Sequence, residues 1–124
     1  MVEPERTRSP AYLALRASAR RVLRLVEAEI ARQGSGVATI YTDQFELCGS
    51  RRVYRPALAE IHALGLAEIT RQPKRYVCRL SNRWSEVRTM QDALIASTMA
   101  REHCNDDAGV WPSHTEDGGA TTIA

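Results

Sequence analysis

The strongest constraint on the fold of this chain is a capped, one-sided apolar stretch at residues 50–66, SRRVYRPALAEIHALGL. It opens on Ser50, a favoured helix N-cap, and closes on Gly65, which suits the left-handed residue that ends a helix. Between them, apolar residues recur at steps of three and four and predict a helix with one buried face: Tyr54, Ala57, Leu58, Ile61 and Leu64. Arg51, Arg52 and Arg55 fall outside this stripe, crowded toward the start of the helix. A helix of this kind is suited to a DNA major groove.

The same stretch resembles the recognition helix of bacterial winged helix-turn-helix regulators, including the GntR type. That helix often reads S-R-x-x-V-x-x-A-L-x-x-L-x-x-x-G-L. Here Tyr54 stands in place of the Val, and Ile61 stands in place of the second Leu. The resemblance covers roughly residues 12–81. It implies a mainly α fold with a small β-hairpin, the wing, and a DNA-binding protein that regulates transcription.

The chain before this helix supplies the elements that the resemblance requires. Residues 11–33 have an apolar stripe at helical spacing and predict a long helix that stops at Gly34. Residues 37–40 are β-prone and long enough for a single edge strand. Thr42 is expected to cap a second, short helix that runs through Cys48.

The chain after Gly65 predicts a hairpin. Residues 66–71 and 76–80 are β-prone, and Gln72-Pro73-Lys74-Arg75 joins them as a short turn. The complete order is therefore helix, strand, helix, helix, strand, strand, as in a winged helix.

The ends of the chain differ from this domain at residues 11–83. Residues 1–10 are polar, contain two prolines and are predicted to be disordered. Residues 84–104 are rich in helix-forming side chains and predict a further helix outside the domain. Residues 105–124 are predicted to be a disordered, acidic tail.

The predicted C-terminal helix carries two partial apolar faces. The residues of its main stripe are Trp84, Val87, Met90 and Leu94, and those that point elsewhere are Ile95 and Met99. Two apolar faces suit a helix that packs on its own domain and also on a second copy of the chain, so residues 84–104 are a candidate homodimer interface. The alternative is an ordinary helix folded back on the first helix.

Charge is distributed unevenly along the chain. Residues 12–83 carry 13 Lys and Arg against 6 Asp and Glu, a net of +7, whereas residues 84–124 carry 2 against 7, a net of −5. A basic body indicates an anionic partner. Sixteen of the 17 basic residues are Arg, as a GC-rich genome would produce, so their positions are more informative than their number.

Several classes of protein are disfavoured by what the sequence lacks. There is no run of 18 apolar residues and no apolar segment near the charged N-terminus, so a membrane span and secretion are not expected. The three cysteines have no C-x-x-C spacing, which favours reduced thiols in a cytoplasm and no metal site. No catalytic motif is present, so neither an enzyme nor a cofactor is predicted.

The candidate DNA contacts lie on the helix that follows Ser50 and on the hairpin. Arginine can bond guanine O6 and N7 together or clamp a phosphate, and hydroxyls and free N–H groups at helix starts can bind phosphates. The predicted DNA-contacting residues are Thr42, Ser50, Arg51, Arg52, Arg55, Arg71, Lys74 and Arg75.

Pro56 interrupts this pattern, because a proline inside a helix deletes one backbone hydrogen bond. Either Pro56 is the true start of the helix, or the helix bends there. Both alternatives change the directions in which Arg51 and Arg52 point.

Three functions are consistent with these features. The first is a sequence-specific, double-stranded DNA-binding transcriptional regulator. The second is a replication initiator of a plasmid, phage or other mobile element, because such proteins also use winged helices. The third is a protein-docking winged helix with no role on DNA, which the acidic C-terminal segment supports.

Overall fold

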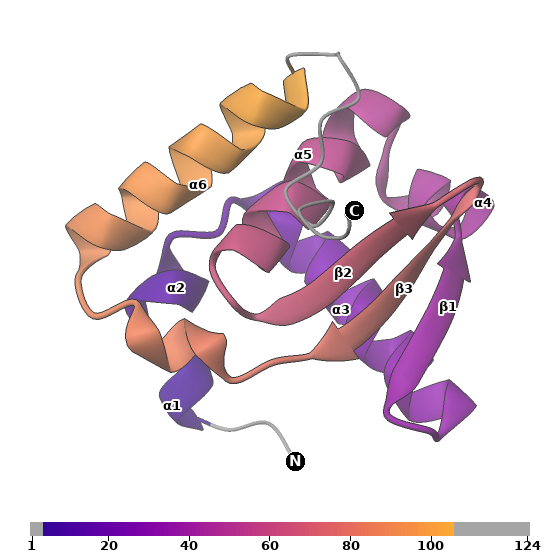
Figure 1. Ribbon diagram of the computed structural model, residues 1–124, viewed down its shortest axis with the longest axis horizontal. Coiled ribbons are helices and arrows are strands. Elements are labelled where there is room, and N and C mark those ends of the chain that lie inside the picture. The colour runs from indigo at the N-terminus through magenta and orange to yellow at the C-terminus, as the bar shows by residue number, and fades with distance from the viewer. Residues whose placement is uncertain (1–3, 106–124) are drawn as a thin grey trace, which may run out of the picture.

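The computed structural model describes residues 4–105, in which helices pack against one small antiparallel sheet (Figure 1). In chain order the elements are α1 (Pro4–Thr7), α2 (Pro10–Leu13), α3 (Ala17–Gln33), β1 (Val37–Tyr41), α4 (Thr42–Phe45), the 3-10 turn η1 (Glu46–Cys48), α5 (Arg51–Ala63), β2 (Ala67–Gln72), β3 (Arg75–Leu80), the 3-10 turn η2 (Arg83–Glu86) and α6 (Met90–Asn105). The strand order is β1-β3-β2, so β1 is an edge strand, as predicted. The predicted order of elements is confirmed from α3 to β3.

The N-terminal segment forms two short helices, and the prediction that residues 1–10 are disordered is wrong for residues 4–10. Ser9 is buried, and its hydroxyl accepts a hydrogen bond from the Tyr12 N–H at 3.2 Å, which caps α2. Pro10 occupies the first turn of α2, where its missing N–H costs nothing. Arg6 forms an ion pair with Glu27 of α3. These contacts hold the segment against the domain.

The single helix predicted for residues 11–33 is broken at Arg16. Its backbone is extended (φ −74°, ψ 165°), and its N–H donates to Oε1 of the buried Glu60 at 3.1 Å. The chain therefore leaves the helical path to satisfy a carboxylate that lies 44 residues away in the sequence. The helix resumes as α3 and ends at Gly34, which has φ 78°, as predicted.

The hydrophobic core lies between α3, α5 and the sheet. The inward side chains of α3 are Ala19, Val22, Leu23, Val26 and Ile30. Phe45 is fully buried, and its ring is 5.7 Å from the Tyr54 ring of α5 and 5.4 Å from the Tyr76 ring of β3, measured between centroids. This aromatic cluster fixes the position of α5 relative to the hairpin.

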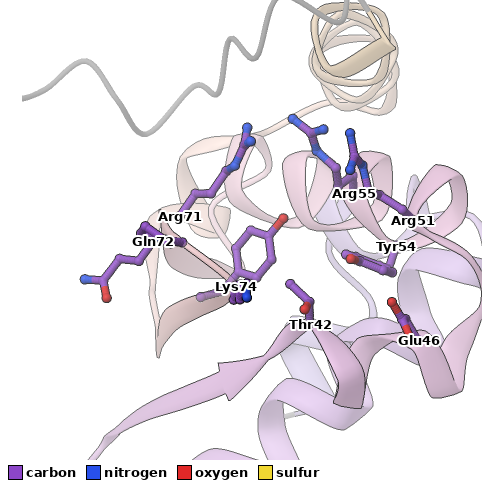
Figure 2. Close-up of a pocket in the computed structure, with 10 residues that line it drawn as sticks. Thr42, Glu46, Arg51, Tyr54, Arg55, Arg71, Gln72 and Lys74 are labelled. Carbon is purple, nitrogen blue, oxygen red and sulfur yellow. The ribbon is translucent and has the colours of Figure 1, made fainter.

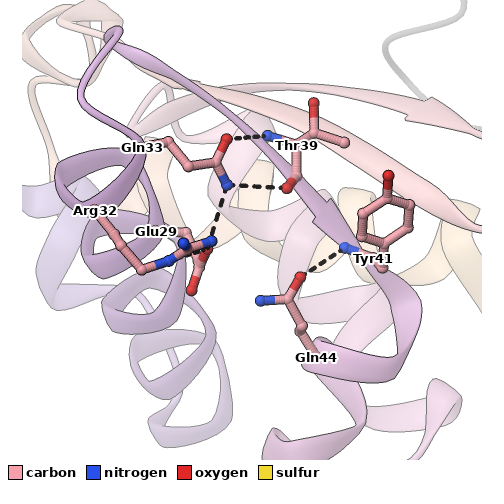
Figure 3. A network of polar contacts seen from close by, with 6 residues as sticks. All are labelled: Glu29, Arg32, Gln33, Thr39, Tyr41 and Gln44. Carbon is pink, nitrogen blue, oxygen red and sulfur yellow. Dashed lines mark hydrogen bonds and ion pairs between the residues drawn. The ribbon is translucent and has the colours of Figure 1, made fainter.

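The open edge of β1 is covered by a side chain of α3 (Figure 3). The Gln33 amide donates to the Thr39 carbonyl at 3.1 Å and accepts from the Thr39 N–H at 3.1 Å. Glu29 accepts from Gln33 at 3.2 Å and from the Arg32 guanidinium at 2.6 Å, which holds the amide in place. An unpaired edge strand is a template for aggregation, so this network protects the sheet.

The helix α5 begins at Arg51, so the alternative that Pro56 starts the helix is wrong. Ser50 is the N-cap residue, although its side chain makes no capping bond. Its carbonyl accepts from the N–H groups of Val53 and Tyr54 at 2.8 and 3.0 Å, which sets the first turn. Pro56 lies buried within the helix. The packed surroundings stabilise the helix despite the missing hydrogen bond.

Gly65, just beyond the end of α5, has to be a glycine for two physical reasons. It has φ 78°, as predicted, a conformation that other residues rarely adopt. A Cβ at this position would also lie 2.6 Å from the backbone carbon of Arg83 and 2.6 Å from the backbone nitrogen of Trp84. The chain that leaves the hairpin therefore passes directly over the end of α5.

The predicted hairpin and its turn are confirmed. β2 and β3 pair from Ala67 opposite Leu80 to Gln72 opposite Arg75, leaving Pro73 and Lys74 as the turn. The Thr42 N–H donates to the Lys74 carbonyl at 3.1 Å, so the turn is attached to the start of α4.

The helix predicted for residues 84–104 is two elements, η2 and α6, separated by extended backbone at Val87. Thr89 caps α6, since its hydroxyl accepts from the Asp92 N–H at 3.0 Å. α6 packs along α5 with small side chains, and Ala93 and Ala100 belong to the same core as the rest of the domain. The helix is therefore part of the domain, not outside it.

The outer face of α6 exposes the large apolar side chains Met90, Leu94, Ile95 and Met99. The predicted separation into two apolar faces is therefore wrong, because Leu94 of the main stripe lies with Ile95 and Met99 on one exposed surface, and Met90 is exposed as well. The prediction for the tail beyond α6 lies outside the described residues.

Among residues 4–105, no helix is both long and apolar enough to cross a membrane.

Candidate functional site

A polar pocket of about 520 Å³ lies between the N-terminal half of α5 and the β2–β3 hairpin (Figure 2). The described residues that line it are Thr42, Glu46, Arg51, Tyr54, Arg55, Arg71, Gln72, Pro73, Lys74 and Tyr76. The aromatic cluster around Phe45 forms the adjoining core, because two of the lining residues, Tyr54 and Tyr76, are its members. The pocket is thus built on rigid elements.

The pocket gathers five of the eight predicted contact residues: Thr42, Arg51, Arg55, Arg71 and Lys74. In Figure 2, the side chains of Arg51 and Arg55 extend from α5 and that of Arg71 extends from the hairpin, with their guanidinium ends on the same side of the pocket. Among the described lining residues, Glu46 is the only acid. Four cations against one carboxylate make this a positively charged site.

Arg55 departs from the prediction that it lies on an exposed helix face. Its side chain is buried, with 9% of its surface exposed, in the pocket between α5 and the hairpin. Its Nε and Nη2 atoms are buried and have no hydrogen-bond partner among the described residues. A buried guanidinium without partners is costly, so its position calls for an explanation.

Lys74 occupies a strained backbone conformation at the tip of the hairpin. Its φ of 62° makes it the only non-glycine residue among residues 4–105 with positive φ. Proline followed by a residue of positive φ is typical of a type II turn, in which glycine is favoured at the second position. The turn therefore carries a lysine at a cost of about 1–2 kcal/mol. Strain of this kind is concentrated at functional sites.

The other predicted contact residues lie outside the pocket. Ser50 and Arg52 are exposed at the start of α5. Arg75 is exposed next to the hairpin turn, and its Nε donates to the Gln72 side chain at 2.8 Å. Thr42 lines the pocket, but the prediction that it caps the short helix is wrong, since Tyr41 is the N-cap residue and Thr42 is the first residue of α4.

Hydroxyl groups add hydrogen-bonding capacity to the cations. Burial raises the pKa of Tyr54, so its hydroxyl stays protonated and can donate a hydrogen bond at neutral pH. Tyr76 and Thr42 contribute two further hydroxyl-bearing side chains to the lining. The pocket is therefore chemically suited to a group with several acceptor oxygens.

α5 also carries a buried carboxylate, outside the pocket, that the sequence pattern did not single out. Glu60 has 0% of its surface exposed and accepts hydrogen bonds from the Arg101 guanidinium at 2.7 Å and from the Arg16 N–H at 3.1 Å. It thereby connects α5 to α6 and to the start of α3. The signal in the sequence was a glutamate beside the apolar stripe of a helix, which by itself indicates no partner.

Cys78 and His62 have structural roles. Cys78 is buried in the sheet, and burial raises the pKa of its thiol to about 12. His62 accepts a hydrogen bond from the Ile69 N–H at its Nδ1 atom, at 3.1 Å, and burial lowers its pKa. Among residues 4–105, no three His, Cys, Asp or Glu side chains are grouped so that they could hold a metal ion.

Comparison with known proteins adds nothing to this geometry, since no family model, no curated protein and no solved structure matches the chain.

Proposed function

We propose that the protein is a sequence-specific DNA-binding protein with a winged helix-turn-helix domain, and that it regulates transcription in a bacterial cytoplasm. The observation that carries this proposal is the convergence of Arg51 and Arg55 from α5 with Arg71 and Lys74 from the hairpin on one positively charged pocket. The order of elements from α3 to β3 supports the winged-helix assignment.

The N-terminal end of α5 is the part proposed to enter the major groove. Arg51 and Arg52 are exposed in its first turn. Arginines there can form paired hydrogen bonds with guanine. The unpaired N–H groups of a helix start also favour a nearby phosphate. This end of the helix therefore combines base-reading side chains with an attraction for the backbone.

The hairpin is the proposed backbone contact. Lys74 and Arg75 are exposed at and beside its tip, and Arg71 lies partly exposed along β2. Phosphate contacts of this kind position a protein without reading sequence. The strain at the turn then has a functional reason, because a glycine would relieve the strain but would lack the positive charge of Lys74.

A homodimer is part of the proposal. The inner face of α6 packs on its own domain, whereas Leu94, Ile95 and Met99 are about half exposed on the outer face. A second copy that packs on this face would give two α5 helices for one DNA site, about 34 Å apart on successive turns. Such a protein would recognise a palindromic sequence.

The test is a fluorescence-anisotropy titration of labelled duplex DNA, both random and enriched by selection, at several salt concentrations. We expect Arg51→Ala to weaken binding to the selected duplex by ~1–3 kcal/mol, about five- to 150-fold, and to relax base preference. Lys74→Ala should weaken all duplexes alike and reduce the salt slope by about one unit. Arg32→Ala is the charge-matched control, because Arg32 lies on α3 and is bonded to Glu29.

A chain that shows no salt-dependent binding to any duplex would contradict the proposal. Loss of binding in Arg32→Ala that equals the loss in Arg51→Ala would indicate attraction by net charge alone. In the first case, a protein-docking role becomes the alternative function, and the exposed apolar face of α6 is a candidate docking surface for it.

A further inference from the structure

The buried, unpaired guanidinium of Arg55 is the feature that the proposed function leaves unexplained. Most arginines of this protein lie at the surface or form ion pairs, such as Arg101 with Glu60 and Arg83 with Glu68. Arg55 has 9% of its surface exposed, and two of its three nitrogens are buried without a partner among residues 4–105. A guanidinium keeps its charge under all ordinary conditions. The site therefore contains an uncompensated positive charge.

The surroundings of Arg55 determine which kind of group would compensate it. Arg51, Arg71 and Lys74 line the same pocket, so a positively charged ligand is not favoured there. Glu46 also lines the pocket but is not a partner of the Arg55 Nε or Nη2 atom. The fork of a guanidinium matches the oxygens of phosphate or carboxylate, and the four cations favour the more highly charged of these two.

The size of the pocket is consistent with a phosphate attached to a larger body. Its volume of about 520 Å³ exceeds that of one phosphate ion and lies within the range of small-molecule sites. The guanidinium ends of Arg51, Arg55 and Arg71 gather on one side of the pocket (Figure 2). A phosphate bound on this side meets the arginines and leaves the rest of the pocket for the body to which it is attached.

We propose that this pocket is a phosphate-binding site anchored by Arg55. The phosphate belongs either to the DNA backbone, in which case the inference rests on the proposed function, or to a free phosphate monoester. In both cases Arg55 donates from Nε and Nη2, the two atoms that lack partners. Arg51, Arg71 and Lys74 neutralise the remaining charge. Arg55 is thus assigned to phosphate, not to a base edge.

This assignment predicts an unusual relation between stability and binding. An anion that binds only the folded state stabilises it in proportion to the logarithm of its concentration. Removal of the unpaired charge of Arg55 relieves the free protein of a buried cation. Arg55→Met should therefore unfold at the same temperature as the wild type or at a higher one without phosphate. It should gain nothing when phosphate is added.

The experiment follows thermal unfolding of the full chain in inorganic phosphate and in chloride of equal ionic strength. We expect phosphate to raise the midpoint of the wild type, and to leave that of Arg55→Met unchanged. Arg52→Met is the matched control, because Arg52 is exposed on the same helix outside the pocket, and it should keep the shift. Arg55→Lys keeps the positive charge but loses the two-pronged guanidinium, so it should retain only part of the phosphate-induced shift.

A second readout on the wild-type protein covers the case in which Arg55→Met fails to fold. The Nε–H resonance of Arg55, identified with Arg55→Lys, should move when inorganic phosphate or a deoxynucleoside monophosphate is added. If duplex DNA moves the same resonance and competes with phosphate, the source is the DNA backbone. If phosphate binds but DNA does not compete, the site serves a free phosphate, and the anisotropy titration decides the DNA proposal separately.

Two results would overturn the inference. One is an unfolding temperature and an Arg55 resonance that do not respond to phosphate in the wild type. The other is an equal response in wild type and Arg55→Met, which would place the phosphate elsewhere. Normal DNA binding by Arg55→Met together with either result would leave the proposed function intact and remove only the role of this pocket.

Discussion

Replacement of Glu60 by methionine should destabilise the protein by about 3–4 kcal/mol. The substitution keeps the volume of a fully buried side chain and removes its two hydrogen-bond acceptors. The charge-assisted bond from Arg101, at 2.7 Å, is worth about 1.5–3 kcal/mol, and the Arg16 N–H left without its acceptor costs about 1–3 kcal/mol. The lower half of the summed range applies, because Arg101 is 24% exposed and keeps its bond to Ser97 at 2.6 Å.

A second variant separates the charge of Glu60 from its hydrogen bonds. Glu60→Gln keeps an oxygen that can accept from the Arg16 N–H and loses only the charge. Its cost should be about 1–2 kcal/mol. The double variant Glu60→Met with Arg101→Met removes both members of the buried pair, so its cost should be smaller than the sum of the two single costs.

The assay is urea unfolding followed by circular dichroism, with free energies compared at a common slope. A domain of this size has roughly 5–15 kcal/mol of total stability, so a loss of 3–4 kcal/mol is easily resolved. A Glu60→Met protein within about 1 kcal/mol of the wild type would refute the reasoning. It would mean that α6 and the start of α3 are held by apolar packing alone.

Three further predictions concern other parts of the molecule. Lys74→Gly should relieve the backbone strain of the left-handed residue and raise the free energy of unfolding by about 1 kcal/mol while weakening DNA binding. Lys74→Ala should weaken DNA binding to the same extent without the gain in stability. Urea unfolding and anisotropy on the same samples would disprove this if the two variants had equal stability. Burial lowers the pKa of His62 from 6.5, so as the pH falls the unfolded chain binds a proton at this histidine before the folded chain does. The free energy of unfolding should therefore be unaffected by His62 above pH 6.5 and should fall as the pH drops below it. His62→Gln should flatten this part of the stability–pH curve, and an unchanged curve would exclude His62 as the cause of the fall. Ile95→Glu, on the outer face of α6, should leave the fold intact and abolish self-association in sedimentation; a wild-type monomer at tens of micromolar, on and off DNA, would rule out the proposed dimer.

The sequence by itself determined the local elements of this protein. Gly34 and Gly65 end their helices because glycine adopts positive φ without strain, and this preference is independent of the rest of the chain. The apolar stripe around Leu58 predicted the buried face of α5 because a helix repeats every 3.6 residues. Pro73 marked the hairpin turn for an equally local reason, its restricted φ.

Only the tertiary structure decided where these elements break and what their polar side chains meet. α3 starts at Ala17 because Glu60, distant in sequence, takes the Arg16 N–H. α6 packs on α5 with Ala93 and Ala100 inward, so Leu94 and its neighbours remain outside.

The sequence likewise predicted the cationic residues of the candidate site, but it did not predict the pocket that they line or the burial of Arg55. The spacing of Arg51 and Arg55 identified a cationic end of α5, and the turn identified the cations of the hairpin. The burial of Arg55 arises in the folded pocket that α5 and the hairpin line together, and no helical periodicity encodes that burial. Local preferences act within a few residues, whereas burial is a property of surfaces brought together by the whole chain.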